Sequence, residues 1–201
     1  MRFSDPASLS PPAPRAAGPR KVSARARGAI PALLGAAALG GLGACSRPDA
    51  FAPACPQLAL LQDGADLTRF AGTGRDLTDL VVDAHLTAIP AACHWADDRH
   101  RKVEAKVKVM MSFGRGPAMS GRTIDVPYFV AVSEGDAIFD KQVYAMRADF
   151  PANIDRLGVT SPEISMLFPV SADKSAAAYK ITVSFQLTPE ELAYNRARMS
   201  H

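Results

Sequence analysis

The chain has 201 residues, with 23 basic and 20 acidic side chains, four histidines, three cysteines and a formal charge of +3. Six basic residues but only one acidic residue precede Cys45, so residues 45–201 carry 17 basic and 19 acidic side chains, a formal charge of −2. This balance gives no excess of basic residues, so nucleic acid is not an expected partner. The 157 residues from Cys45 onward suffice for one domain with a sizeable core.

An uncharged apolar run ends at a cysteine in the first quarter of the chain. Residues 28–41 are rich in alanine and leucine, and 14 residues are too few for a helix that crosses a bilayer core of about 30 Å. Arg25 and Arg27 precede the run, and Leu42-Gly43-Ala44-Cys45 follows it. A buried helix is the competing interpretation, but the proline and glycines of the run would destabilise it. The order of basic, apolar and small residues before a cysteine resembles a bacterial lipoprotein signal.

The lipoprotein resemblance implies a modification and a location. Cys45 would carry a diacylglycerol on its sulfur and an N-acyl chain on its amine once the signal is removed. One acyl chain binds membranes only marginally, so several together make a stable anchor. Ser46 at the next position is similar to the pattern of outer-membrane sorting, with the outer leaflet of the inner membrane as the alternative. We therefore expect a membrane-anchored protein that faces the periplasm and needs no further cofactor.

The same resemblance divides the chain. Residues 1–44 are the expected signal peptide, residues 45–56 the lipidated cysteine and an extended tether, and residues 57–201 a single domain. Cys55 and Cys93 then remain as a pair in a compartment that permits disulfides. A bridge between them would close a loop of about 39 residues and contribute roughly 4 kcal/mol in the chain-entropy model. Two free buried thiols are the alternative.

Apolar and polar residues alternate along much of the domain, which predicts β-strands with one buried face. The strands are expected at residues 77–89, 103–113, 124–132, 137–147, 164–170 and 179–187. The clearest alternation is at 103–113, and the least clean is at 137–147. Pro127 removes a backbone donor, so we expect an edge strand or a bulge at that point. Residues 150–162 are expected to form a loop with one helical turn near 153–157.

The last part of the chain predicts a helix. Thr188 and Glu191 have the spacing of a capping box, and Pro189 occupies the first helical position. We expect a short helix over residues 189–199 with Leu192 as its main apolar anchor. The strands and short turns together predict a mainly β fold, an antiparallel two-sheet sandwich with a short C-terminal helix. An immunoglobulin-like topology is compatible with it, although the cysteine and tryptophan spacing of true immunoglobulin domains is absent.

A charged loop follows the second cysteine of the pair. His94, Asp97, Asp98 and His100 fall within seven residues, and imidazole and carboxylate groups are metal ligands. Three cationic side chains are interleaved with them and would oppose binding of a metal ion. Because the spacing matches no standard metal motif, a solvated loop is the favoured interpretation and no metal is expected.

His85 shares the polar face of its predicted strand with Asp83 and Asp79. A base oriented by a carboxylate occurs in catalytic sites. Residues two apart on a strand are neighbours by default, however, and the sequence has no Gly-x-Ser-x-Gly motif that would supply a nucleophile. A hydrolase is therefore only weakly supported, and no catalytic residue is assigned.

Two further segments are candidates for binding. Arg115 and Arg122 flank a glycine-rich connection that could bind an anion, although a flexible hairpin loop is the simpler interpretation. Tyr128 and Phe129 point to opposite faces of one strand, so an aromatic side chain would be exposed if that strand lay at an edge. Such an edge would suit strand addition by a partner. The alternative is that both faces are covered.

The domain resembles uncharacterised proteobacterial envelope lipoproteins in the segments DLTDLVVDA, CHW, RGPA, PYFVAV and LTPEELAYNRAR. The resemblance implies a compartment and an architecture but no activity. We expect a lipid-anchored envelope protein with a structural or assembly role that binds another envelope protein. The alternative is a module that binds a small ligand or metal through residues 94–102 and 114–122.

The N-terminal segment is longer than a lipoprotein signal requires, since the basic residues next to the apolar run suffice. We expect translation to start at Val22, read from a GTG codon. N-terminal mapping of the unprocessed precursor should find no peptide from residues 1–21. Detection of that segment in the precursor would contradict the expectation.

Overall fold

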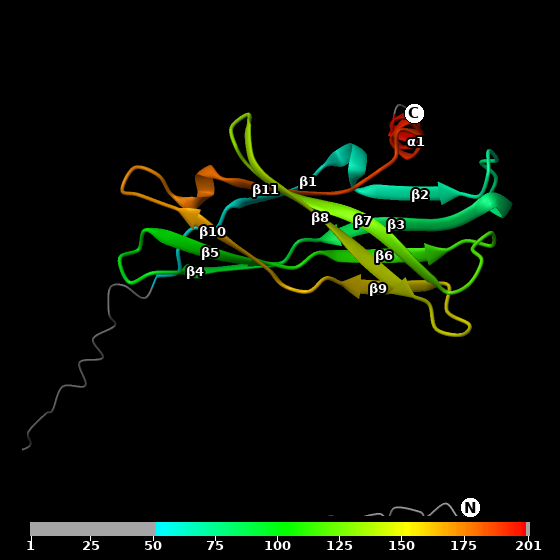
Figure 1. Ribbon diagram of the computed structural model, residues 1–201, viewed down its shortest axis with the longest axis horizontal. Coiled ribbons are helices and arrows are strands. Elements are labelled where there is room, and N and C mark those ends of the chain that lie inside the picture. The colour runs from blue at the N-terminus through cyan, green and yellow to red at the C-terminus, as the bar shows by residue number, and fades with distance from the viewer. Residues whose placement is uncertain (1–50, 200–201) are drawn as a thin grey trace, which may run out of the picture. The chain divides into compact units, whose positions relative to one another are not determined.

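The computed structural model describes residues 51–199 (Figure 1). The expectations for the signal peptide, the start at Val22 and the lipidation of Cys45 lie outside these residues. Within residues 51–199, no helix is both long enough and apolar enough to span a membrane.

One sheet forms the first layer of the domain. Its strands lie in the order β1, β11, β7, β8. They span Gln57–Leu60 (β1), Lys180–Phe185 (β11), Thr123–Glu134 (β7) and Ala137–Asp149 (β8). The pair β1 and β11 is parallel, and the other pairs are antiparallel. The strand predicted at 137–147 is therefore present as β8, and it is an edge strand of this sheet.

Two smaller sheets form the second layer. The first has the order β2 (Asp66–Phe70), β3 (Leu80–Ala88), β6 (Met110–Arg115) and β9 (Arg156–Thr160). The second has the order β10 (Ile164–Pro169), β5 (Lys102–Val107) and β4 (Ala91–Trp95). The chain passes directly between these sheets from β3 to β4, β5 to β6 and β9 to β10.

Backbone hydrogen bonds join the two smaller sheets where the chain crosses between them. The N–H of Lys108 donates to the carbonyl of Pro90, and the N–H of Ser161 donates to the carbonyl of Val109. The three sheets therefore make two layers, with β7 and β8 crossing over the second (Figure 1). The predicted mainly β sandwich with a short C-terminal helix is confirmed, and an immunoglobulin-like topology is compatible with it.

The strand predicted at 103–113 is in fact two strands, β5 and β6, in different sheets. Its predicted inward side chains are all buried nonetheless. They are Val103, Ala105, Val107, Val109, Met111 and Phe113. Val109 lies between the strands and is fully buried, so the alternation continues through the break. Period-two burial locates the inner face but does not reveal a change of sheet.

Two other segments differ from the sequence predictions. Residues 91–95, where no strand was expected, form β4. Residues 156–160 form β9 where a helical turn was expected near 153–157. The turn comes earlier, with the backbone of Asn153 in the left-handed region at a φ of 62°.

Pro127 lies in an inner strand, because β7 is paired on both sides. The only register shift in the β7–β8 ladder lies between Val132 and Ser133, so the expected edge or bulge at Pro127 was wrong. Pro127 accepts a hydrogen bond from the N–H of Gln186, which lies just beyond the end of β11. A proline is tolerated there because its missing donor faces the end of the neighbouring strand.

The helix α1 spans Pro189–Met199, as predicted. Its capping box is present: the N–H of Thr188 donates to Glu191 Oε2 at 2.9 Å, and the N–H of Glu191 donates to Thr188 Oγ1 at 3.2 Å. The buried residues of the helix are Glu191 and Asn195, whereas Leu192 is only half-buried. The expected apolar anchor was therefore wrong, and polar contacts hold much of the helix.

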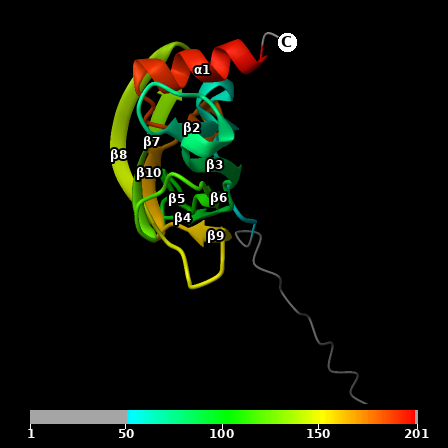
Figure 2. The ribbon, with the colours of Figure 1, turned by 90° about the vertical axis from the view of Figure 1, so that its right-hand side faces the viewer.

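One margin of the sandwich is closed. The chain crosses from β1 to β2 through a short 3₁₀ turn, Gln62–Gly64, and α1 packs on that turn and on β2 (Figure 2). Cys55 and Cys93 form the predicted disulfide, with their Cα atoms 5.6 Å apart. Because Cys55 precedes β1 and Cys93 lies in β4, the bridge joins the margins of the two layers.

The disulfide should contribute strongly to stability. Replacing Cys55 and Cys93 together with serine is expected to lower the free energy of unfolding by about 4 kcal/mol, because the unfolded chain regains the entropy of a closed loop. Urea titration followed by fluorescence of Trp95, the single tryptophan, measures this change. Dithiothreitol should destabilise the wild type similarly and leave the double variant unaffected. A double variant within about 1 kcal/mol of the wild type would contradict the expectation.

Candidate functional site

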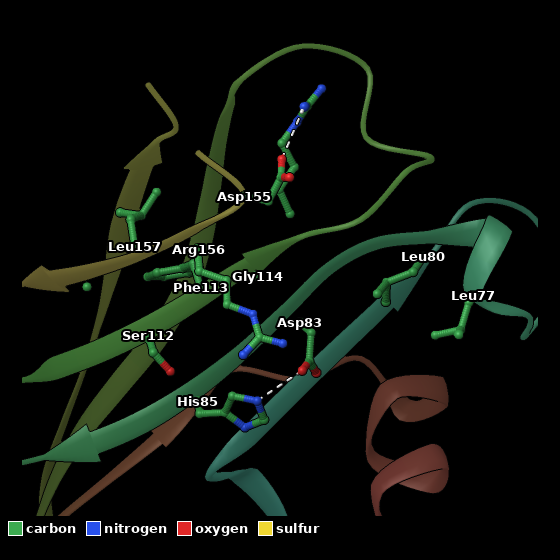
Figure 3. Close-up of a pocket in the computed structure, with 12 residues that line it drawn as sticks. Leu77, Leu80, Asp83, His85, Ser112, Phe113, Gly114, Asp155, Arg156 and Leu157 are labelled. Atoms are coloured by element: carbon green, nitrogen blue, oxygen red, sulfur yellow. Dashed lines mark hydrogen bonds and ion pairs between the residues drawn. The ribbon is translucent and has the colours of Figure 1, made fainter. Parts of the chain in front are cut away.

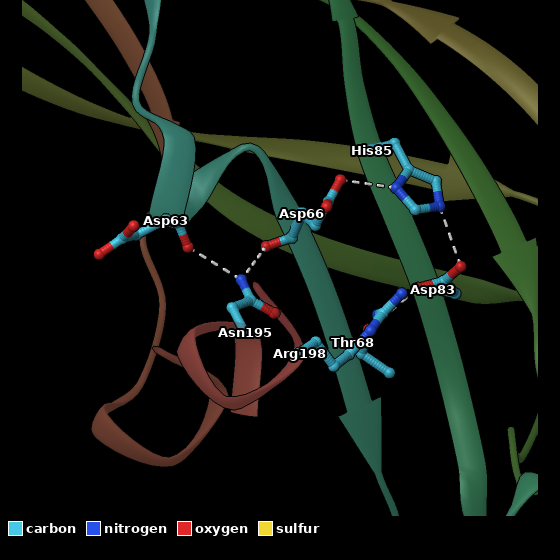
Figure 4. Close-up of polar contacts among 7 residues, drawn as sticks. All are labelled: Asp63, Asp66, Thr68, Asp83, His85, Asn195 and Arg198. Atoms are coloured by element: carbon cyan, nitrogen blue, oxygen red, sulfur yellow. Dashed lines mark hydrogen bonds and ion pairs between the residues drawn. The ribbon is translucent and has the colours of Figure 1, made fainter. Parts of the chain in front are cut away.

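His85 lies between two carboxylates on the outer face of the second layer (Figure 4). Its Nδ1 is 2.7 Å from Asp66 Oδ1, and its Nε2 is 2.9 Å from Asp83 Oδ2. Asp83 was expected beside His85, and the structure places it there. The second carboxylate is Asp66, the residue opposite His85 on β2, whereas Asp79 lies in the 3₁₀ turn Leu77–Asp79. The sequence did not indicate Asp66, since only the strand register brings it to His85.

The two carboxylates favour the charged form of His85. Burial lowers the pKa of the imidazole, but the hydrogen bonds and negative charges of Asp66 and Asp83 outweigh burial and raise the pKa above its usual 6.5. Both ring nitrogens are engaged, so neither can accept a proton from a neighbouring hydroxyl. Ser112 stands opposite His85 on β6, but an imidazole with both nitrogens bound to carboxylates acts as a structural cation and not as a general base.

The His85 cluster is connected to α1. Thr68 Oγ1 donates to Asp83 Oδ1 at 3.0 Å, and Arg198 Nη1 donates to Thr68 Oγ1 at 3.4 Å. Asn195 Nδ2 donates to the carbonyl of Asp66 at 2.8 Å. These polar contacts help to join α1 to β2 and β3 (Figure 4). The cluster therefore contributes to the docking of a helix that has few buried apolar side chains.

A cavity of about 570 Å³ lies beside this cluster. Leu77 and Leu80 are among its apolar lining residues, and the guanidinium of Arg156 extends toward Asp83 (Figure 3). Arg115, predicted to bind an anion, lines the cavity but donates from Nε to the carbonyl of Gly121 at 3.2 Å. Arg115 Nη1 also lies 3.8 Å from Asp155. Its guanidinium is thus used to hold its own loop.

The other proposed ligand residues do not converge with Arg115. Arg122 is exposed and is not among the residues that line the cavity. In the 94–102 loop, His94 Nε2 is 2.7 Å from Glu104, and the ring of His100 stacks on Trp95 at 4.5 Å between centroids.

The acidic residues of that loop also have structural surroundings. Asp97 Oδ1 accepts the backbone N–H groups of Arg101 and Lys102 at 2.8 and 3.0 Å, while Asp98 is exposed. Within residues 51–199, no three histidine, cysteine, aspartate or glutamate side chains are placed to hold a metal ion. The loop is organised by hydrogen bonds to its own backbone and by ring stacking.

The predicted interaction edge at Tyr128 and Phe129 was wrong, because β7 is an inner strand. Tyr128 is 2% exposed and stacks on Tyr144 with 5.4 Å between ring centroids. Phe129 is covered by Lys141, whose Nζ lies 4.1 Å from the ring centroid. The free margin of this sheet is β8, the next strand along the chain.

Large apolar side chains are exposed where β8 faces β9 and β10 on the other layer. We call this side, residues 137–149 and 156–169, the open margin. The exposed fractions are 70% for Ile138, 61% for Phe139, 56% for Val143 and 62% for Leu167. The poor alternation at 137–147 was the sequence signal of this surface, since a strand with one buried face would not place Ile138 and Phe139 side by side.

A groove of about 500 Å³ lies in the open margin, between the start of β8 and β10. Its apolar lining includes Phe139, Met166, Leu167 and Tyr179. Val132 pairs with Asp140 and Ser133 pairs with Ile138, which leaves Phe139 as an extra residue in β8. This bulge turns the Phe139 ring toward the groove, 6.3 Å from the ring of Tyr179.

The charge on His85 makes stability depend on pH. Because the folded pKa is raised above 6.5, this stabilisation is complete below pH 6.5 and is lost as the pH rises through the folded pKa. The free energy of unfolding, measured by urea titration at pH 5.5 and 8.5, should fall less in His85→Gln than in the wild type. Equal falls in the two proteins would contradict this expectation.

Comparison with protein-family models, with curated proteins and with solved structures gave no match. The roles proposed for this chain therefore come from its own residues.

Proposed function

We propose that this chain is a lipid-anchored, periplasm-facing envelope protein with a structural or assembly role, which binds another envelope protein through its open margin. The observation that carries the proposal is a groove lined by the exposed side chains of Phe139 and Leu167, with Ile138 and Val143 also exposed along β8. Contiguous apolar patches on soluble proteins commonly mark interaction sites, because burying them against a partner releases ordered water.

The margin also presents a long edge strand, which the bulge at Phe139 and charged side chains such as Lys141 protect only in part. β8 is 13 residues long, and its outer side pairs with no other strand within residues 51–199. Long exposed edges invite pairing with other chains, and proteins usually shorten, charge or cover them. A partner that covers β8 would remove this liability.

The proposed location is supported by the cysteines. The disulfide between Cys55 and Cys93 is typical of a protein exported to an oxidising compartment. In our proposal, Cys45 carries the diacylglycerol and N-acyl chain, and residues 46–56 link it to the domain. The outer membrane is the proposed destination, with the outer leaflet of the inner membrane as the alternative.

Photo-crosslinking in intact cells tests this function. A photoreactive phenylalanine analogue in place of Ile138 should give a discrete adduct with another envelope protein, identified by mass spectrometry. The same analogue at Thr87, an exposed position of β3, is the matched control and should give none. The Cys45→Ser variant, which lacks the lipid anchor, should lose most of the adduct. No adduct at Ile138, or equal adducts at both positions, would reject the proposal.

A further inference from the structure

The hydrogen-bond pattern of β7 determines which backbone groups of β8 are free. Successive residues of an antiparallel strand point their N–H and C=O groups to alternate neighbours. The carbonyl of Pro127 accepts the N–H of Gln186, so Pro127 faces β11. Its opposite residue on β8 is Ala145, whose N–H and C=O must therefore turn away from β7. Arg122 lies five residues before Pro127, so its backbone groups should face the opposite side, toward β8. The hydrogen bond from the N–H of Phe150 to the carbonyl of Arg122 agrees with this alternation.

The same parity holds along the part of β8 that follows the bulge at Phe139. Lys141, Val143, Ala145 and Arg147 all point their backbone N–H and C=O groups outward, into the open margin. Within the described part of the chain, no strand pairs with β8 on that side. A row of alternating donors and acceptors at strand spacing is complementary to the backbone of another extended chain.

The side chains of these four residues define the chemistry of that chain. Val143 and Ala145 offer an exposed apolar surface, whereas Lys141 is cationic. Arg147 is already paired, since its Nε and Nη2 donate to Asp125 at 2.9 and 3.0 Å. The Lys141 ammonium lies over the Phe129 ring and forms no ion pair among residues 51–199. Opposite charges are favoured in cross-strand pairs, so Lys141 favours an acidic residue opposite it.

The groove lies beside this end of β8. An extended chain that pairs with Lys141 continues past Asp140 and the bulged Phe139, which line the groove together with Leu167 and Phe168 of β10. Strand side chains alternate between faces, so the residue after the acidic one points toward this apolar lining. A large apolar side chain at that place would bury the exposed rings.

We propose that the open margin binds an extended segment of another polypeptide, which adds to β8 as an antiparallel strand. Its backbone pairs with Lys141, Val143 and Ala145, an acidic residue lies opposite Lys141, and an aromatic residue follows it into the groove. This inference rests on the proposed function and specifies how the partner is bound.

A defined peptide tests the binding mode with the full chain purified in detergent. The probe is a blocked, fluorescein-labelled octapeptide in which threonine and valine alternate three times before a final glutamate and phenylalanine. Fluorescence anisotropy should show saturable binding. A peptide with lysine in place of the glutamate should bind about tenfold more weakly, and Lys141→Glu should reverse that preference.

A proline in β8 separates strand addition from mere apolar contact. Because the N–H of Val143 points outward, Val143→Pro removes a donor for the added strand without breaking a bond to β7. Binding should weaken about tenfold or more relative to Val143→Ala, which keeps the N–H. Unchanged thermal unfolding would show that both variants fold. If Val143→Pro does not fold, the reversed peptide preference of Lys141→Glu still tests the proposal.

Each outcome bears on a different claim. If the peptide fails to bind the wild type, or binds Val143→Pro and Val143→Ala equally, strand addition is overturned while the Ile138 adduct can still support the proposed function. An absent Ile138 adduct would overturn the function itself. If sedimentation shows a dimer that Val143→Pro dissociates, a second copy occupies the margin and the proposal of a different partner is wrong.

Discussion

The two margins of the sandwich differ: one carries the disulfide and the C-terminal helix, and the other carries a free edge strand, β8. The disulfide between Cys55 and Cys93, the crossover from β1 to β2 and the docking of α1 all lie on the closed margin. On the other side, β8 approaches β9 without forming a sheet with it, and a groove remains over β10. The free edge of β8 and the groove thus lie on the margin that has neither the disulfide nor α1.

The sequence indicated which face of each strand is buried, but it did not indicate which strands lie beside it in a sheet. Alternation predicted that Val103 through Phe113 would point inward, and each expected side chain is buried. The same alternation does not reveal that the chain passes at Val109 from the sheet of β5 to the sheet of β6, because burial of one face does not depend on which sheet a strand joins. The expectation of an edge or a bulge at Pro127 was wrong for a related reason. The sequence shows that a backbone donor is missing, but only the fold shows that this position lies opposite the end of β11.

The candidate sites show the same division between local and long-range information. The capping box at Thr188 and Glu191 is local and was predicted, and so was the neighbourhood of Asp83 and His85. Asp66 reaches His85 through the register of β2 and β3, which the sequence does not specify. The expected edge at Tyr128 fell one strand away from the real one, since alternation cannot order the strands within a sheet.

The position of the disulfide has a mechanical consequence for a tethered domain. Cys55 precedes the first residue of β1 by only two positions, and its bridge leads to Cys93 in the other layer. Tension that arrives from the N-terminal side is therefore shared covalently with β4 before it loads the hydrogen bonds between β1 and β11. A domain pulled between a membrane and a bound partner would resist peeling of its first strand, because the force enters both layers at once.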